Sequence, residues 1–452
     1  MKTINTFLIS LLCFLLAFPA YLMAGPKDGQ VVAGQAEIQQ MDNLTTIDQS
    51  TNKAVLNWRS FDIEQNEAVR HNMPSSDSSA LHRVIGGGGA SKLAGELSSN
   101  GNIYLVNPAG VVIHQGARID TGGFVASTND ISNENFMDNN LVFDKPGQAG
   151  AQILNQGHIN VKESGLAALV APSVRNEGVI AAKLGKVALA SGDSAYKLDM
   201  YGDDLINFTV EEEKVDQLHA IDGTPLGVEN TGKIKAEGGL VILSATQLDG
   251  VVSSVVNSGV VAADSAELKG GRVIFKGQGE KVGLVNIGEV TASSEVSDGG
   301  SITMVAEGEV KVSGQVKAEG QEKGGQIDIS GQKNTEITEA DLSAQGAQEG
   351  LIRLGGAFQG GKITDYSDRS GFVDRFGQLA SLANSGGLYI DAASKISAGP
   401  DGTLILWSQG LTESQGFLSG RYLETSGKGL IIPTAPTVSP NGIWLIDPDN
   451  IT

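Results

Sequence analysis

Short stretches in which apolar and polar residues alternate recur along this chain, and many of them follow the same kind of turn. An alternation with a period of two indicates β-strands, because successive side chains of a strand point to opposite faces. Five of the stretches follow an Asn-x-Gly turn, whose first residues are Asn155, Asn176, Asn230, Asn257 and Asn286. The interval from Asn176 to Asn230 is about twice as long as the other three, so it is expected to hold two coils of a repeating structure.

A second turn, built on a pair of glycines, recurs in step with the first. Each pair precedes another alternating stretch, and the pairs are Gly238-Gly239, Gly270-Gly271, Gly299-Gly300, Gly324-Gly325 and Gly386-Gly387. Glycine adopts positive φ angles readily and asparagine tolerates the left-handed region, so both suit tight turns. Each coil is therefore expected to contain at least two short strands.

These repeats predict an all-β fold, a right-handed parallel β-helix. Asparagines at the same place in successive coils would stack and hydrogen-bond from one coil to the next. The alternative is a β-sandwich, whose strands recur at intervals of roughly 8 to 12 residues. A sandwich does not explain why Asn-x-Gly recurs at much longer intervals, so the β-helix is favoured.

Three segments interrupt the repeats and predict structure outside the coils. Residues 25–54 precede the first clear repeats and are expected to cap the open end, where an uncovered coil would present an edge able to pair with other strands. Residues 193–225 are expected to form an extra-helical hairpin. Residues 364–383 carry charged and aromatic residues at repeat positions and are expected to form a surface loop or a short helix.

Residues 1–24 have the pattern of an export signal. Met1 and Lys2 form a basic start, residues 7–18 are apolar, and a cleavage site precedes Gly25. No other segment supplies the roughly 20 apolar residues that a membrane span needs, so none is expected in the mature chain. The chain's one cysteine, Cys13, would leave with the signal, so the mature chain would contain no disulfide and could cross a pore unfolded.

The charge of the chain excludes one class of partner. The formal net charge is −20 at pH 7, with 60 glycines and 5% aromatic residues. A strongly acidic surface repels the phosphates of nucleic acid and of anionic lipid, so no nucleic-acid partner is expected.

A parallel β-helix can also be the fold of an enzyme that acts on polysaccharides. That chemistry needs carboxylates gathered beside a sugar groove. The densest carboxylates, Asp203, Asp204 and residues 211–213, lie in the predicted hairpin with no neighbouring arginine, which favours a solvated face. Four glycines at 86–89 lack the lysine and hydroxyl residue of a phosphate loop. The five histidines are scattered without metal-ligand spacing, and most of them are expected at the surface or in turns; they are His71, His82, His114, His158 and His219. We therefore predict no catalytic residue, no cofactor and no metal.

Two other groups of residues have structural explanations. Trp58 and Phe61 are expected in the core near the cap. Asn107-Pro108-Ala109-Gly110 fits a type I turn, with proline at its second position.

Residues 31–130 closely resemble the haemagglutination-activity, or two-partner-secretion, domain of filamentous haemagglutinins. The matching stretches are residues 31–34 (Val-Val-Ala-Gly), 55–63 (Val-Leu-Asn-Trp-Arg-Ser-Phe-Asp-Ile), 82–84 (His-Arg-Val) and 101–111 (Gly-Asn-Ile-Tyr-Leu-Val-Asn-Pro-Ala-Gly-Val). The last stretch is similar to the Asn-Pro-Asn-Gly-Ile motif of that family, with Ala109 and Val111 at its third and fifth positions. No clear copy of the family's Asn-Pro-Asn-Leu motif is present. Later stretches resemble the same exoproteins, namely residues 341–346, 352–356, 424–428 and 442–448.

This resemblance implies a domain organisation and a route of export. Residues 1–24 would be the signal peptide, 25–300 the secretion domain and 301–452 further β-helical repeats of a truncated product. An outer-membrane transporter would recognise the chain through its periplasmic domains and pass it through its barrel, and the chain would fold at the cell surface. The resemblance assigns a secretion role to Asn107, Pro108, Gly110 and Val111. It implies that the whole protein is an adhesin or haemagglutinin with an unspecified receptor; a contact-dependent toxin or cytolysin, or a polysaccharide-active enzyme, is the alternative.

Overall fold

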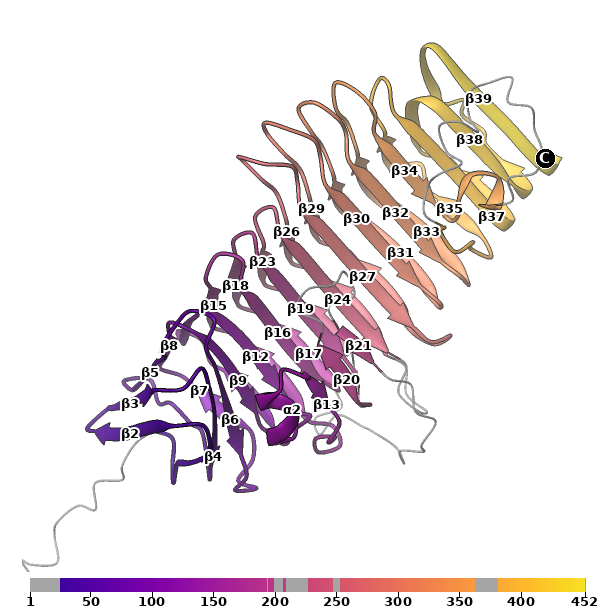
Figure 1. The fold of residues 1–452 in the computed structure, drawn as a ribbon. Helices are drawn as coiled ribbons and strands as arrows, with labels where there is room; N and C mark the ends of the chain where they lie inside the picture. Colours follow the sequence, from indigo (N-terminus) through magenta and orange to yellow (C-terminus); the bar gives the residue numbers. More distant parts are fainter. Residues whose placement is uncertain are drawn as a thin grey trace, which may run out of the picture.

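The chain forms the right-handed parallel β-helix that its repeats predict, and the coils stack into a long rod (Figure 1). The structure is a computed structural model that describes residues 25–192, 194–198, 206–208, 227–246, 253–361 and 381–451. Each regular coil contributes a strand to each of three parallel sheets, one more strand than the minimum expected. The predicted signal peptide, residues 1–24, lies outside the described residues.

Within each sheet, the strands of successive coils pair in register along the rod. The first sheet contains β4 (Lys53–Trp58), β6 (Ser79–Val84), β9 (Asn102–Val106), β12 (Gly123–Ser127), β16 (Leu166–Ala171), β19 (Lys186–Ser191), β24 (Leu240–Thr246), β27 (Arg272–Gln278), β30 (Ser301–Ala306), β32 (Gln326–Gly331) and β34 (Leu351–Leu354). The second contains β7 (Ser91–Leu93), β10 (Gly110–Ile113), β14 (Gln152–Asn155), β17 (Ser173–Asn176), β22 (Gly227–Asn230), β25 (Ser254–Asn257), β28 (Gly283–Asn286) and β35 (Leu388–Ile390).

The third sheet contains β3 (Leu44–Gln49), β5 (Ala68–Asn72), β8 (Glu96–Ser99), β11 (Arg118–Thr121), β15 (His158–Val161), β18 (Val179–Ala182), β23 (Lys233–Lys235), β26 (Val260–Ala262), β29 (Glu289–Thr291) and β36 (Lys395–Ser397). Toward the far end, longer strands bend through two or three sheets; they are β31 (Glu309–Lys317), β33 (Asn334–Ser343), β37 (Thr403–Ser414), β38 (Phe417–Ile431) and β39 (Thr437–Ile451).

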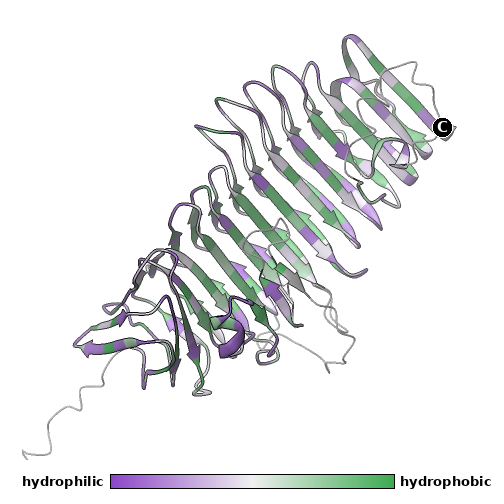
Figure 2. Ribbon diagram, in the orientation of Figure 1, coloured by the Kyte–Doolittle hydropathy of each residue, from purple (hydrophilic) through white to green (hydrophobic). Residues whose placement is uncertain are grey.

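The core fills the inside of the coils because one face of every strand is apolar. On β30, for example, Ile302 and Met304 point inward and lie next to Val273 and Phe275 of β27. Such contacts repeat from coil to coil, so one continuous hydrophobic cluster runs from Ile47 to Leu423. Figure 2 shows hydrophobic positions along the strands of the whole rod.

An antiparallel cap closes the N-terminal end, as the sequence predicts, but it is shorter than the predicted residues 25–54, because β3 and β4 already belong to the parallel sheets. β1 (Gln30–Ala33) pairs with β4, and β2 (Ala36–Met41) pairs with β3, both in the antiparallel sense. Val31, Ala36 and Ile38 pack against the core of the first coils. The cap therefore covers an apolar end that would otherwise face water.

The prediction of two coils between Asn176 and Asn230 is wrong. β17 pairs directly with β22, and the two asparagines are partners in that register. One coil therefore spans the interval, and the surplus residues leave the helix. Among them, β20 (Tyr196–Leu198) and β21 (Ile206–Phe208) form the antiparallel pair of the predicted hairpin. The other residues of 193–225, apart from 194 and 195, lie outside the described residues, including Asp203, Asp204 and residues 211–213.

This hairpin is part of a cover on the outer face of the first sheet. β13 (Val142–Phe143) pairs with β20, and the short helix α2 (Asn133–Met137) lies beside it. The Phe143 and Tyr196 rings stack with centroids 4.7 Å apart. A second hydrophobic cluster forms here between the cover and outward residues such as Leu81 and Val125. The strands of this sheet from β4 to β24 are thus largely buried on both faces.

The remaining predictions concern the glycine pairs, residues 364–383 and membrane-spanning segments. Four glycine pairs open strands of the first sheet, whereas Gly386-Gly387 opens β35 of the second. Of the predicted loop or helix at 364–383, residues 364–380 lie outside the described residues. A short turn, η1 (Phe358–Gly361), precedes it. In the described ranges no helix is long and apolar enough to span a membrane.

Candidate secretion site at the capped end

The candidate secretion motif forms a tight turn between β9 and β10. The Gly110 N–H donates to the Asn107 carbonyl oxygen at 2.9 Å, which closes a four-residue turn. The Ala109 N–H donates to Asn107 Oδ1, also at 2.9 Å. The Asn107 side chain is therefore used inside the turn, and the residue is only 2% exposed.

The same side chain fastens the glycine-rich loop to the turn. Asn107 Nδ2 donates to the Gly89 carbonyl oxygen and to Ser91 Oγ, each at 3.0 Å. On the other side, the Pro108 carbonyl oxygen accepts from the Gln148 N–H at 2.8 Å. The turn thus connects two loops, and residues 86–89 serve as a structural loop.

Gly110 and Val111 are constrained by the backbone of the next coil. Gly110 has a φ of +111°, and a Cβ there would lie 2.4 Å from the Gln152 carbonyl oxygen. Val111 is fully buried and points into the core. Of the four predicted secretion residues, only Pro108 is partly exposed, so the folded turn presents little side-chain surface to a partner. The secretion role of these residues stays a prediction.

Trp58 and Phe61 lie in the core beneath the cap. Both side chains are fully buried, and their rings meet edge to face with centroids 5.5 Å apart. The cap backbone lies so close to the indole that a Cβ at Gly29 would be 2.4 Å from Trp58 Cζ3. The cap is therefore seated directly on the Trp58 ring.

A chain of buried polar side chains leads away from Trp58. Its Nε1–H donates to His82 Nδ1 at 3.1 Å. His82 Nε2 lies 3.1 Å from His71 Nδ1, and His71 Nε2 lies 3.0 Å from Gln49 Oε1. Burial lowers the pKa of His71 to about 4, although Asp48 acts in the opposite direction. Burial also places the pKa of His82 well below its usual value, and His71 lowers it further.

His71 and His82 are exceptions to the prediction that most histidines lie at the surface or in turns. Both residues are fully buried, because each occupies an inward position of a strand. His71 follows Val69 by two residues on β5, and His82 follows Ala80 by two on β6. The alternation of apolar residues was the signal that could have placed them inside.

The five repeated asparagines form a ladder at the corner after the second sheet. Every one of them is fully buried. The Nδ2 of each of the first four donates to the Oδ1 of the next asparagine, at 2.7 Å from Asn155 to Asn176, 2.7 Å from Asn176 to Asn230, 2.8 Å from Asn230 to Asn257 and 2.7 Å from Asn257 to Asn286. The glycines of the same turns stack closely, and a Cβ at Gly232 would lie 2.2 Å from the Gly178 carbonyl oxygen. Both the asparagine and the glycine of Asn-x-Gly therefore serve the stacking of coils.

Charged residues are also buried on the outer face of the first sheet, where the sequence pattern did not indicate them. Arg83 Nε pairs with Asp130 at 2.8 Å, and its Nη2 donates to the Ile131 carbonyl oxygen at 2.6 Å. Farther along the rod, Arg353 is paired with Asp328 through two bonds of 2.7 Å. Arg83, Asp328 and Arg353 occupy outward positions of the first sheet, so strand alternation alone predicts them as exposed.

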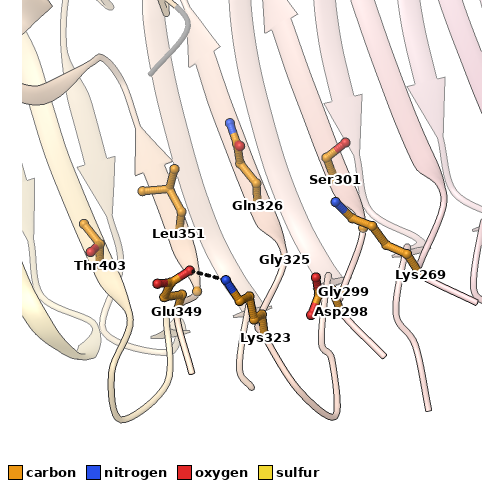
Figure 3. A pocket seen from close by; sticks show the side chains of 13 residues that line it. Lys269, Asp298, Gly299, Ser301, Lys323, Gly325, Gln326, Glu349, Leu351 and Thr403 are labelled. Atoms are coloured by element: carbon orange, nitrogen blue, oxygen red, sulfur yellow. Dashed lines mark hydrogen bonds and ion pairs between the residues drawn. The ribbon is translucent and has the colours of Figure 1, made fainter. Parts of the chain in front are cut away.

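A shallow groove of about 620 Å³ runs along the stacked glycine turns at the start of the first sheet (Figure 3). One charged residue per coil lines its rim, and the charges alternate in sign: Lys269, Asp298, Lys323 and Glu349. Lys323 Nζ lies 3.1 Å from Glu349 Oε2. The groove thus offers compensated charges rather than a pair of carboxylates. Among the residues described, no group of histidine, cysteine, aspartate and glutamate could hold a metal ion.

Comparison with known proteins places the capped end in a family. The family model of the TPS secretion domain matches residues 23–291. The chain belongs to the TPS secretion domain family. The matched region of this TPS domain includes the cap, the buried Trp58 chain, the Asn107 turn and the asparagine ladder.

Solved and curated relatives agree with this assignment. The crystal structure of the HMW1 secretion domain from Haemophilus influenzae aligns with a TM-score of 0.64 and 28% identity, over 94% of this chain and 100% of that one. A heme/hemopexin-binding protein of Haemophilus influenzae strain Rd is 33% identical over 279 residues, which is 60% of this chain and 29% of the relative. A second heme/hemopexin-binding protein from Haemophilus influenzae is 30% identical over 310 residues, which is 62% of this chain and 32% of that relative. The chain therefore spans less than a third of the length of these two relatives.

Membership of this family also indicates the general route of export and the general kind of partner. Proteins with a TPS domain are secreted across the outer membrane, and the domain implies a transporter in that membrane. The relatives found are secretion domains and heme/hemopexin-binding proteins rather than enzymes.

Proposed function

We propose that this chain is the N-terminal secretion-directing region of a large surface or secreted adhesin or haemagglutinin. The observation that carries the proposal is a capped β-helix whose first part, residues 23–291, matches the TPS secretion domain. In this proposal the signal peptide of residues 1–24 directs the chain to the periplasm. Residues 25–300 then form the domain that the transporter's periplasmic parts recognise, and residues 301–452 continue the rod.

The burial of the Asn107 turn restricts how recognition can occur. A transporter cannot contact Asn107, Gly110 and Val111 while the coils are closed, since all three are buried. The turn segment would therefore be recognised before the β-helix forms. An extended chain segment can add to a partner's sheet edge through main-chain hydrogen bonds, which require few specific side chains.

Folding outside the cell follows from the stacked coils. Each coil contacts mainly its neighbours, so a formed coil is a template for the next one and folding can propagate along the rod. Because the only cysteine is Cys13, the chain after the predicted signal has no disulfide that would hinder unfolded passage.

The proposal is tested by substitutions in the turn, measured as the secreted fraction with the transporter co-expressed. Gly110→Ala and Asn107→Asp are expected to reduce secretion at least tenfold. The first introduces a Cβ beside Gln152 at positive φ, and the second removes the donor to Gly89. Gly116→Ala is the matched control, since Gly116 also has positive φ, +89°, but no atom within 4 Å of its Cβ position.

Undiminished secretion of both turn variants would contradict the proposed role of this segment. To separate recognition from folding, the same variants are refolded after purification without residues 1–24. A variant that refolds with an unchanged urea midpoint but is not secreted has lost recognition by the transporter.

Heme or hemopexin binding, which the relatives' names suggest, is a second candidate function with less support than secretion. They are called heme/hemopexin-binding proteins, but the aligned part is less than a third of each. Such a partial match supports common export through the TPS secretion domain rather than a common ligand. No observation on the described residues favours a toxin, a cytolysin or a polysaccharide-active enzyme.

A further inference from the structure

The buried chain that begins at Trp58 has only one possible arrangement of its protons. An indole N–H can donate but not accept, so His82 Nδ1 must carry no proton. The His82 proton is therefore on Nε2 and is donated to His71 Nδ1. His71 then carries its proton on Nε2 and donates it to Gln49 Oε1.

The far end of the chain agrees with this arrangement. Gln49 Nε2 donates to two carbonyl oxygens, of Thr51 at 2.6 Å and of Ser79 at 3.3 Å. Since carbonyl oxygens only accept, the Gln49 amide must turn its own oxygen toward His71. Both histidines are thus neutral, and each ring nitrogen is committed.

An additional proton has no place in this arrangement. On His82 Nδ1 it would face the Trp58 N–H, and on His71 Nδ1 it would face the His82 N–H. In both cases a donor meets a donor inside a fully buried site, and one bond of the chain is lost.

The surroundings offer little to stabilise a charged imidazole. His71 lies between Ile47 of β3 and Ser99 of β8 in the strand register, and His82 lies between Leu56 of β4 and Leu105 of β9. None of these four residues is titratable. Phe61 packs on the His82 ring with centroids 5.0 Å apart. The carboxylate that acts on the pair is Asp48, which favours protonation of His71.

We propose that the His71–His82 pair is a pH-sensitive lock on the N-terminal cap, which stays closed only while both imidazoles are neutral. The hydrogen-bonded side chains from Gln49 to Trp58 connect the two strands to which the cap is attached, because Gln49 is the last residue of β3 and Trp58 is the last residue of β4. β3 pairs with cap strand β2, and β4 pairs with cap strand β1. Protonation therefore acts on the two strands that hold the cap.

The direction of the pH effect follows from the unfolded chain, where histidine titrates near pH 6.5. Above that pH neither state gains a proton, so the lock is at full strength. Below it, the open cap accepts protons that the closed cap excludes, and the lock weakens until the buried histidines titrate, near pH 4 for His71. Each histidine weakens closure by up to tenfold per pH unit in this window.

Hydrogen exchange of the whole chain, corrected for the intrinsic rate at each pH, tests the lock. Amide protection in β1, β2 and β3 is expected to fall ten- to a hundredfold between pH 7.5 and pH 5.5. Protection in β24 and β27 is expected to stay constant. Protection of the cap that does not change with pH would overturn the proposal.

Two variants identify the responsible groups. His82→Gln can still accept from Trp58 and donate to His71 but cannot titrate, so the pH response of the cap is expected to shrink to that of one histidine; His158→Gln, on the exposed start of β15, is the control. Asp48→Asn removes the charge that favours protonated His71. The onset near pH 6.5 is expected to stay, and the response, followed in this variant and the wild type to below pH 4, is expected to extend to lower pH. An unaltered response in both variants would contradict the lock, and Asp48→Asn decides the matter if His82→Gln does not fold.

Discussion

At the scale of single residues, the asparagine ladder and the chain from Trp58 to Gln49 consist of buried polar side chains that hydrogen-bond to one another. The asparagine ladder could be predicted because Asn-x-Gly recurs at the same place in successive coils, and a stacked amide can both donate and accept. The histidine pair could not be predicted as a pair, because each histidine occurs once and its partner lies in another sheet. Repetition is therefore a signal for polar contacts along the rod, whereas contacts across its interior leave no periodic trace in the sequence.

Replacing an asparagine in the middle of the ladder is expected to destabilise the chain. Asn230→Ala leaves Asn176 Nδ2 and Asn257 Oδ1 buried without their partners. Each unsatisfied group costs about 1 to 3 kcal/mol, so the expected loss of unfolding free energy is about 3 kcal/mol. Urea denaturation measures it as a lower midpoint. Thr231→Ala changes an exposed residue of the same turn and should leave the midpoint unchanged; equal midpoints for both variants would show that the ladder adds nothing.

At the scale of elements, the strands were predictable and their covers were not. Strands follow from alternation and glycine turns, which are local signals, and the antiparallel cap follows from the need to cover an open coil. α2 has five residues, which is too short for a helical period to appear in the sequence. β13 and β20 are far apart in the sequence, so no local pattern joins them. The number of coils between Asn176 and Asn230 was predicted wrongly for the same reason, because no local pattern shows that β20 lies outside the coils and pairs with β13.

The short turn η1 is another segment that covers the rod. Its attachment depends on pH through Glu424. The Gln359 N–H donates to both carboxyl oxygens of Glu424, at 3.0 and 3.2 Å. Glu424 of β38 is fully buried, and burial raises its pKa to about 8. Trp407 of β37 lies beneath the same turn, because a Cβ at Gly360 would be 2.4 Å from its Cζ2.

The unfolding free energy is expected to fall as this carboxyl ionises. The folded pKa lies above the unfolded value of about 4.3, so the stabilisation is complete below pH 4 and is lost as the pH rises through about 8, by about 1.4 kcal/mol per pH unit in between. Urea midpoints of the wild-type chain at pH 7 and pH 9 measure the last part of this loss, about 1.4 kcal/mol, at pH values above those at which histidine titrates. Glu424→Gln keeps a neutral side chain and should flatten this part of the profile, whereas Glu267→Gln, at an exposed position, should not. A Glu424→Gln profile parallel to that of the wild type would assign the loss to another group.

At the scale of the whole molecule, the rod is a series of similar coils held by contacts between neighbours. The hydrophobic cluster is continuous, and in the strand register inward side chains lie beside their counterparts in the neighbouring coils, as Phe275 does beside Met304. In such a solenoid the stability is approximately a sum of terms for each repeat and each interface. Local damage should therefore spread over a few coils rather than unfold the whole rod at once.

A cavity in the middle of the rod tests this view. Phe275 is fully buried and lies between Leu243 of β24 and Met304 of β30 in the strand register. Phe275→Ala is expected to cost about 3 to 5 kcal/mol locally, because the cavity removes contacts with both neighbouring coils. Hydrogen exchange should then show a loss of protection of at least a hundredfold in β24, β27 and β30 and no change in β6 and β9. Lys276→Ala, on the outer face of the same strand, is the control. Equal loss of protection along the entire chain would mean that the rod unfolds as one cooperative unit, and the secretion domain could then not fold coil by coil as it leaves the transporter.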